Sequence, residues 1–274
     1  MQNTHIMEAS AANTFENLPM RDRVIKFEHP LNERYRFFLR LEYLFNLLEH
    51  HMAWESPENS HTAVATLLDT INVVSRTDIK TETVKELDRI AGVLAPLKDK
   101  PGIEMGTLDE VLSTLKQLGA QLRGITGPID KELKEVDLLK ALQQRNNIAG
   151  GLCDFDLPAY RFWLKQLPER RLQDLQSWLK PFRPLQYAVE SALDLVRGST
   201  APEREVAEDG IYKRSLDTKS PCQLIIVSLP VNTAYFAEFS GSRHRFTVRF
   251  MDATQKHPTQ ANNNVEFDLS CGKL

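Results

Sequence analysis

Residues 242–250 read SRHRFTVRF, with arginines at alternate positions and, from Arg245 onward, a strict alternation of polar and apolar side chains. In a β-strand, side chains two residues apart share a face at a spacing of roughly 7 Å. The pattern therefore predicts a strand with Arg243, Arg245 and Arg249 on one face and an apolar row turned into a core on the other. Neighbouring guanidinium groups repel one another unless an anion lies over them. That anion is either an acid of this chain or a part of another molecule.

An internal source of negative charge is present in residues 265–269, which read VEFDL and alternate in the same way. An antiparallel pairing of this segment with the arginine strand would match Glu266 and Asp268 with guanidinium groups. Two carboxylates cannot easily neutralise three arginines, and arginine is the usual residue for binding a partner's carboxylates through two hydrogen bonds. Both interpretations stay open at this level.

Other short segments share the β character of the arginine strand. Residues 224–229 and 234–239 are β-branched or aromatic and are separated by turn residues, which predicts a small antiparallel sheet. A sheet of few strands has exposed edges. We therefore expect the early segment 24–27 to return and pair with it, which would make the β domain discontinuous in sequence.

The region between these β segments has the 3.6-residue period of amphipathic helices. Helices are predicted at 35–52, 61–74, 80–94, 107–122, 133–142, 157–164, 169–179 and 184–197. The fold class is thus α+β, an N-terminal multi-helix bundle domain followed by a small antiparallel β-sheet domain that the N-terminal strand joins. The expected domains are a disordered extension at 1–23, the strand at 24–30, the helical domain at 31–200, an acidic linker at 201–210 and the β domain at 211–274.

Composition narrows the class of protein. With 274 residues and 42% hydrophobic content, the chain is long enough for one large or two modest cores. A net charge of -3 argues against a nucleic-acid protein that works by bulk positive charge. Residues 1–23 lack the apolar region of a secretory signal, and no segment approaches the ~20 apolar residues of a membrane span. Three widely spaced cysteines fit no disulfide framework, so we expect a cytoplasmic protein.

Catalytic patterns are not found in the sequence. The seven histidines never take the spacing of a metal site, and no glycine-rich phosphate loop occurs. Cys153 follows a Gly-Gly pair, but no general base can be assigned to it. We therefore predict a protein that is not an enzyme and that needs no cofactor or metal.

Four segments, taken in order, carry a family resemblance: 27–34 (FEHPLNER), 85–89 (KELDR), 150–158 (GGLCDFDLP) and 245–251 (RFTVRFM). The chain from about residue 24 onward resembles the ZapD family of cell-division proteins. The resemblance implies a cytoplasmic homodimer, located at the mid-cell division site, with a helical domain and a β domain. It also implies that the protein binds the C-terminal tail of FtsZ, the tubulin-like division protein, and bundles FtsZ filaments into the Z-ring without catalytic turnover.

The family's binding surface is basic, and the resemblance transfers it residue by residue. Its positions match Arg245, Arg249, Arg76 and Arg40, and Arg161 stands in the place of a histidine. Arg243 joins this set through the strand alternation alone. Asp137 departs from the pattern, because it occupies a position where the family has an arginine. This substitution weakens the expectation of a basic surface on the helical domain.

An alternative function for the same strand is the binding of nucleic acid or another anionic ligand. It is suggested by arginines that stand next to aromatic residues. A stacking platform needs its aromatic rings on the same face as its arginines. The alternation places Phe246 and Phe250 on the opposite face. The sequence therefore favours a filament cross-linker over a nucleic-acid module.

Overall fold

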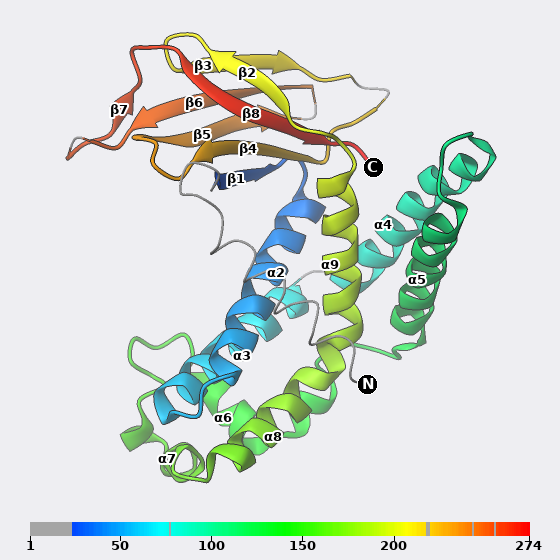
Figure 1. Cartoon of the computed structure of the whole chain (residues 1–274). Helices are drawn as coiled ribbons and strands as arrows, with labels where there is room; N and C mark the ends of the chain where they lie inside the picture. The colour runs from blue at the N-terminus through cyan, green and yellow to red at the C-terminus, as the bar shows by residue number, and fades with distance from the viewer. Residues whose placement is uncertain (1–23, 77, 218–219, 243, 255) are drawn as a thin grey trace. The chain divides into compact units, whose positions relative to one another are not determined.

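The computed structural model describes residues 24–76, 78–217, 220–242, 244–254 and 256–274. These residues divide into two units, a β unit (24–35 and 195–274) and a helical unit (36–194). The predicted extension at 1–23 lies outside the described residues. The fold class is confirmed, because helices precede an antiparallel β region that the first strand joins (Figure 1).

The helical unit follows the predicted amphipathic periodicity. Its α-helices are α2 (Glu33–Met52), α3 (Pro57–Arg76), α4 (Ile79–Leu94), α5 (Met105–Gly124), α6 (Asp137–Arg145), α7 (Pro158–Leu164), α8 (Pro168–Leu179) and α9 (Arg183–Gly198). Short 3-10 turns separate several of them: η2 (Ala95–Asp99), η3 (Glu132–Glu135), η4 (Asp154–Asp156) and η5 (Lys180–Phe182). The first turn of α2 and the last turn of α9 belong to the β unit.

Packing within the helical unit has two parts. Helix α3 contacts α6, α7 and α8, and its Val64, Leu67 and Leu68 are fully buried. Helices α4 and α5 pack on each other as a hairpin (Figure 1), in which Leu87 and Leu122 are buried. The single helix predicted over 133–142 is interrupted, because η3 ends at Glu135 and α6 begins only at Asp137.

The β unit contains two sheets, where the sequence predicts one. Its strands are β1 (Val24–Pro30), β2 (Glu203–Ala207), β3 (Ile211–Ser215), β4 (Leu224–Pro230), β5 (Tyr235–Ser242), β6 (Arg245–Asp252), β7 (Thr259–Gln260) and β8 (Val265–Gly272). One sheet has the order β1-β4-β8-β2, and the other has the order β3-β6-β5 with β7 paired to β6. All pairings are antiparallel.

A shared core holds the two sheets together as a sandwich. Val227 and Phe267 from the first sheet and Val248 and Phe250 from the second are fully buried in one cluster. The rings of Phe250 and Phe267 have centroids 4.8 Å apart, so the two sheets contact each other directly there. Burying side chains of this size stabilises a fold by about 1.5–3 kcal/mol each.

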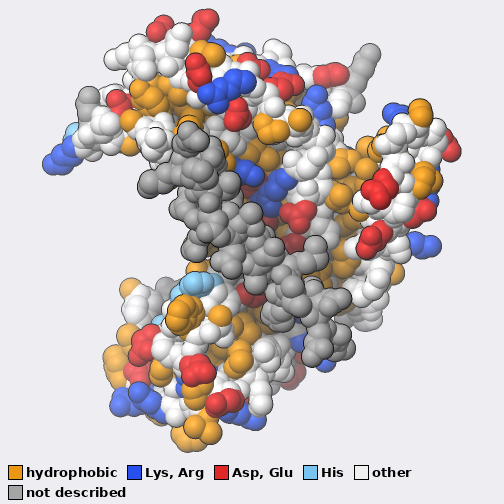
Figure 2. Space-filling model, in the orientation of Figure 1, with side chains coloured by type: hydrophobic (Ala, Val, Ile, Leu, Met, Phe, Trp, Pro, Cys, Tyr) orange, Lys and Arg blue, Asp and Glu red, His pale blue; other side chains and the backbone are white. Residues whose placement is uncertain are grey.

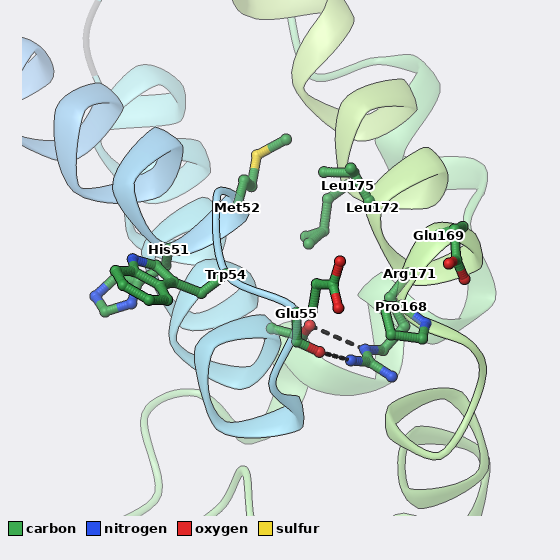
Figure 3. Close-up of a pocket in the computed structure, with 10 residues that line it drawn as sticks. His51, Met52, Trp54, Glu55, Pro168, Glu169, Arg171, Leu172 and Leu175 are labelled. Atoms are coloured by element: carbon green, nitrogen blue, oxygen red, sulfur yellow. Dashed lines mark hydrogen bonds between the residues drawn. The ribbon is translucent and has the colours of Figure 1, made fainter.

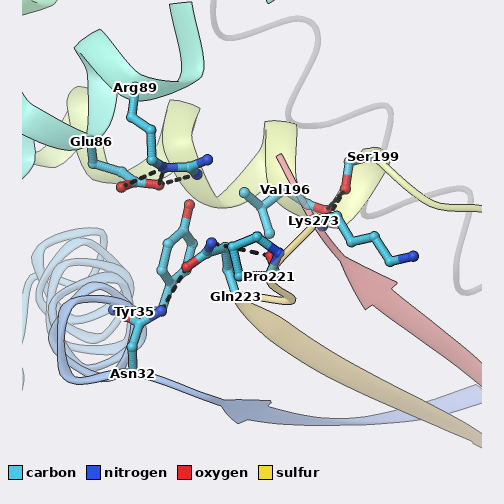
Figure 4. A network of polar contacts seen from close by, with 9 residues as sticks. All are labelled: Asn32, Tyr35, Glu86, Arg89, Val196, Ser199, Pro221, Gln223 and Lys273. Atoms are coloured by element: carbon cyan, nitrogen blue, oxygen red, sulfur yellow. Dashed lines mark hydrogen bonds and ion pairs between the residues drawn. The ribbon is translucent and has the colours of Figure 1, made fainter. Parts of the chain in front are cut away.

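The N-terminal strand joins the β unit as predicted. Strand β1 pairs with β4 in a register that sets Phe27 opposite Val227. Just after β1, the side-chain amide of Asn32 donates to Gln223 Oε1 at 2.7 Å, and Asn32 Oδ1 accepts from the backbone N–H of Tyr35 (Figure 4). Asn32 thus ties the first turn of α2 to the segment that leads into β4.

The expected linker at 201–210 differs in the structure, because its residues Glu203–Ala207 form β2. Asp209 and Gly210, with φ of 47° and 71°, make a two-residue turn that leads directly into β3. Both φ values are positive, as a type I′ hairpin requires, and Asp-Gly is a preferred pair for it. The charged side chains of β2 suggest a linker by composition alone, whereas the Asp-Gly pair is the signal for a hairpin.

Candidate functional site

The predicted alternation of the arginine strand is confirmed from Arg245 onward. Phe246, Val248 and Phe250 are at most 1% exposed and point into the sandwich core. Arg245 and Arg249 are exposed on the opposite side of β6, with the half-buried Thr247 between them. The hydrophobic row fixes the strand, and this in turn fixes the direction of the two guanidinium groups.

Neighbouring strands add further polar groups to the same face. Residues directly opposite each other in an antiparallel pair lie on one face of the sheet. The register sets Ser215 and Ser242 on either side of Arg245, and Lys213 and Ser240 on either side of Thr247. We call the set Lys213, Ser215, Ser240, Ser242, Arg245, Thr247 and Arg249 the basic face.

A shallow groove of about 640 Å³ lies at the Arg245 end of the basic face. Its lining consists of Lys213, Arg214, Ser215, Ser240, Gly241, Ser242, Arg245, Phe246 and Thr247. Three of these side chains are cationic and four carry a hydroxyl group, and the described lining includes no carboxylate. Hydroxyl and cationic donors together suit an anionic ligand, especially a carboxylate.

Arg245 and Arg249 have no ion pair among the described residues of the chain. Glu238 stands directly opposite Arg249 in the register of β5 and β6, but no ion pair forms there. Exposed cations without an internal partner are free to meet an external anion.

The pairing of Glu266 and Asp268 with the arginine strand, which the sequence allows, is wrong. Strand β8, which carries Glu266 and Asp268, pairs with β4 and β2 in the other sheet. There both acids bind Arg204, at 2.9 Å from Glu266 and 3.2 Å from Asp268. These hydrogen bonds raise the pKa of the Arg204 guanidinium. Figure 2 shows acidic and basic side chains lying next to one another on the β unit.

Arg214 is part of the groove but has partners inside the protein. It binds Glu203 at 2.9 Å and approaches Glu205 at 3.7 Å, both on β2. The hydrogen bond that Arg214 donates to Glu203 raises the pKa of the Arg214 guanidinium. Arg214 therefore ties the β2–β3 hairpin together at the edge of the groove, and Lys213 and Arg245 are the cations left for a ligand.

The other four predicted site residues are not shown beside Arg245 and Arg249. Arg243 lies outside the described residues, and Arg76 ends α3 with a side chain that is also outside them. Arg40 is exposed on α2, with its guanidinium carbon 5.7 Å from the centroid of the Phe37 ring. Arg161 is exposed on α7. The structure thus brings together Arg245 and Arg249, and the binding role of all six residues stays a prediction.

Asp137, the departure from the family pattern, begins α6 and is almost fully exposed. It approaches Lys140 at 3.6 Å, one turn along the helix. An acid in the first turn of a helix is favourable for the helix dipole. This local role accounts for an aspartate at the position.

Lys213 and the hydroxyl row are functional candidates that the sequence analysis missed. The signal lies in residues 211–215, which read IYKRS and form β3. The charged residues before them predict a linker, and a linker gives no reason to place this segment beside β6.

A small pocket in the helical unit has a structural explanation (Figure 3). Arg171, only 3% exposed, lies at its wall. Its guanidinium donates to Ser60 Oγ at 3.0 Å and to the carbonyls of Leu164, Gln166 and Glu55. These bonds join the α2–α3 loop to the α7–α8 loop. With a volume of about 60 Å³, the pocket has room for little more than water.

Across the described ranges, no group of three His, Cys, Asp or Glu side chains is arranged to hold a metal ion. No helix in the part of the chain that the structure describes is long and apolar enough to cross a bilayer.

The chain is similar in sequence to a known protein family and to several of its members. A family model described as ZapD, cell division protein, matches residues 39–249. A cell division protein ZapD from Methylococcus capsulatus is 38% identical over 252 residues, covering 92% of this chain and 98% of the relative. Proteins of the same name from Coxiella burnetii and Aromatoleum aromaticum are 36% and 34% identical, covering 91% and 90% of this chain and 98% and 96% of the relatives.

Proposed function

Because the chain belongs to the ZapD family of cell division proteins, we propose that it binds the C-terminal tail of FtsZ and cross-links FtsZ filaments into bundles of the Z-ring. The observation that carries this proposal is the basic face, where Arg245 and Arg249 are exposed and lack an ion pair among the described residues. The protein acts as a connector and catalyses no reaction.

A peptide tail suits the basic face better than a small ligand does. The groove is open and shallow, so a ligand keeps one side in water. Each exposed ion pair contributes about 1 kcal/mol or less. A long flexible ligand offers several such contacts at once, and their sum gives a useful affinity.

Cross-linking requires at least two tail-binding faces in one particle. We propose that a homodimer supplies them, because a two-fold axis places identical faces on two copies. Two weak contacts along a polymer reinforce each other, since the second binding event occurs at a high effective concentration. Sedimentation velocity of the purified protein tests this part, and a species of monomer mass at working concentration would contradict it.

The remaining predicted arginines extend this proposal. Arg40, Arg76, Arg161 and Arg243 are assigned to partner binding by the family resemblance or by the strand pattern. The cytoplasm at the mid-cell division site is the compartment that the proposal requires, because FtsZ assembles there. Fluorescence microscopy of a tagged chain checks this location, and an even distribution in dividing cells would contradict it.

The co-pelleting of polymerised FtsZ with this protein is the direct test. We expect the protein to enter the pellet and to increase the pelleted FtsZ, and we expect both effects to be lost with Arg245→Ala and Arg249→Ala together. Arg204→Ala is the matched control, because that arginine is exposed on the same sandwich but bound by two acids. Undiminished pelleting by the double variant would sink the proposal.

A nucleic-acid module is the second function considered, and the side-chain directions disfavour it. Phe246 and Phe250 are 1% and 0% exposed, so neither ring offers a face on which a base could stack. A gel-shift assay with a single-stranded oligonucleotide tests this function. Tight binding at moderate salt would favour it over tail binding.

A further inference from the structure

The outer face of the β3-β6-β5 sheet changes character along the length of β6. Four rows of cross-strand neighbours follow from the register: Ser215, Arg245 and Ser242; Lys213, Thr247 and Ser240; Ile211, Arg249 and Glu238; Gln260, Met251 and Phe236. The first two rows are cationic or carry hydroxyl groups, and the last two rows contain all three apolar side chains.

The charge is concentrated at the groove end of this face. Lys213 and Arg245 are exposed there, and neither has an ion pair within the described part of the chain. In the third row, Glu238 stands opposite Arg249 without forming an ion pair, so a negative charge lies near this arginine, whereas the first two rows contain none. A carboxylate on a ligand is therefore attracted most strongly to the first two rows.

The apolar end consists of Ile211, Phe236 and Met251, all half-buried. Phe236 lies directly opposite Met251, and Ile211 is on the adjacent strand one row away. The core of the sandwich contains residues next to them in sequence, such as Ala237 and Phe250. Ile211, Phe236 and Met251 themselves are not part of that core as the described residues form it. Apolar side chains on the outer face of a sheet offer a ligand hydrophobic area.

We propose that the FtsZ tail lies lengthwise on this face, with acidic residues over Lys213 and Arg245 and apolar residues over Ile211, Phe236 and Met251. This inference rests on the proposed function. It adds how the tail lies along the sheet and which two kinds of contact hold it there. From Arg245 to Met251 the face measures roughly 20 Å, the length of six or seven extended residues. Charge complementarity at one end and apolar contact at the other favour a ligand with both kinds of residue over a purely acidic one.

Calorimetric titration with three synthetic peptides tests the arrangement. The first peptide has the sequence of the C-terminal tail of FtsZ from the same cell, the second has its acids replaced by the corresponding amides, and the third has its large apolar residues replaced by serine. Each peptide is titrated into the full chain and into its variants, with circular dichroism as the check on folding.

The cationic end is tested with Lys213→Ala. We expect this variant to bind the first peptide about fivefold more weakly, the size of one exposed ion pair. It should bind the amide peptide as the unaltered protein does, because that peptide has no side-chain carboxylate to lose. Arg204→Ala on the other sheet is the control and should bind all three peptides normally.

The apolar end is tested with Met251→Ser. We expect about tenfold weaker binding of the first peptide, from the loss of apolar contact area, and no change for the serine peptide. Val206→Ser is the matched control, since Val206 is 44% exposed on the outer face of the other sheet. Should Met251→Ser fail to fold, Ile211→Ser on β3 makes the same test.

The outcomes separate this inference from the function on which it rests. If the first peptide binds and depends on Arg245 and Arg249, but Lys213→Ala and the apolar variants bind it normally, the arrangement is wrong and tail binding stands. Equal losses for all three peptides would also overturn it, because the contacts would then not be specific. If the unaltered protein binds none of the peptides, the proposed function itself fails.

Discussion

The two outer faces of the β sandwich contain arginines in opposite situations. On the β1-β4-β8-β2 sheet, Arg204 is bound by Glu266 and Asp268, and Arg197 of α9 reaches Glu28 of β1 with two hydrogen bonds of 2.8 Å. On the β3-β6-β5 sheet, Arg245 and Arg249 have no such partner among the described residues. The pairing of the charges distinguishes the two faces, since both carry exposed arginines.

This difference explains why one face is a candidate for binding and the other is not. A guanidinium that already has two carboxylates must give up those bonds before it meets an external anion. Arg245, which stands between Ser215 and Ser242, gives up only water. A count of arginines from the sequence does not separate these cases, whereas the strand order of the two sheets does.

The largest expected effect comes from the core that both faces share. Phe250→Ala removes a fully buried ring that touches Phe267 of the other sheet. We expect a loss of about 3–5 kcal/mol in the free energy of unfolding of the β unit, from lost burial and the cavity left behind. Urea unfolding followed by circular dichroism measures it. Phe155→Ala, at a site that is 69% exposed, should change the stability little.

The next effect concerns the hairpin that leads from one sheet to the other. A Cβ atom on Gly210 would lie 2.5 Å from the carbonyl oxygen of Ala261, and the φ of 71° is unfavourable for a side chain. We expect Gly210→Ala to cost about 1–3 kcal/mol in stability and to weaken tail binding through a displaced β3. Thermal unfolding measures the cost. Gly92→Ala, where the new methyl group has no atom within 4 Å beyond its chain neighbours and its own helix backbone, is the control, and an equal effect of both variants would contradict the account.

A third change makes the basic face resemble the paired face. Thr247→Glu places a carboxylate between Arg245 and Arg249, two residues from each. We expect affinity for the FtsZ tail peptide to fall about tenfold or more, because an internal acid now competes with the ligand. Stability should stay nearly constant. Fluorescence anisotropy with a labelled peptide measures the affinity. Thr247→Gln is the control, because glutamine has nearly the shape of glutamate without its charge. Equal losses for Glu and Gln would show that shape matters rather than charge.

The smallest effect is expected from the reverse change on the other face. Glu266→Gln with Asp268→Asn removes the acids that bind Arg204 and lowers its pKa back toward the ordinary value. Because this cluster is exposed, the loss of stability should be about 1 kcal/mol or less. Denaturant titration measures it. We also expect a weak new affinity for acidic peptides, and a loss of several kcal/mol would mean that the cluster has a larger structural role.

Much of the fold follows from periodicity. The 3.6-residue repeat predicts the helices between 35 and 197, and the alternation at 242–250 predicts which side of β6 is buried. The pairing of β1 with the later strands also follows, because a small sheet has edges to cover. Register and strand order are set by contacts between distant segments, so the pattern of β8 alone could not reveal that Glu266 and Asp268 belong to the other sheet.

The candidate site was predictable in part for the same reason. Arg245 and Arg249 are visible from their own strand. Lys213 comes from a strand that follows the expected linker, and only the hairpin at Asp209 and Gly210 places it beside them. Arg204, the arginine that is paired, is equally visible in the sequence, and its acids are more than 60 residues away. Long-range pairing of charges is the information that sequence patterns lack.

The central claim is that a tail peptide binds through the arginines that lack an internal partner. Anisotropy titration of a labelled FtsZ tail peptide, at about 0.1 M salt where surface charges still act over ~10 Å, compares three full-length proteins: the unaltered chain, Arg245→Ala with Arg249→Ala, and Arg204→Ala. The account predicts an affinity loss of at least about tenfold for the double variant and none for Arg204→Ala. Equal binding by all three proteins, or an equal loss in both variants, would contradict it.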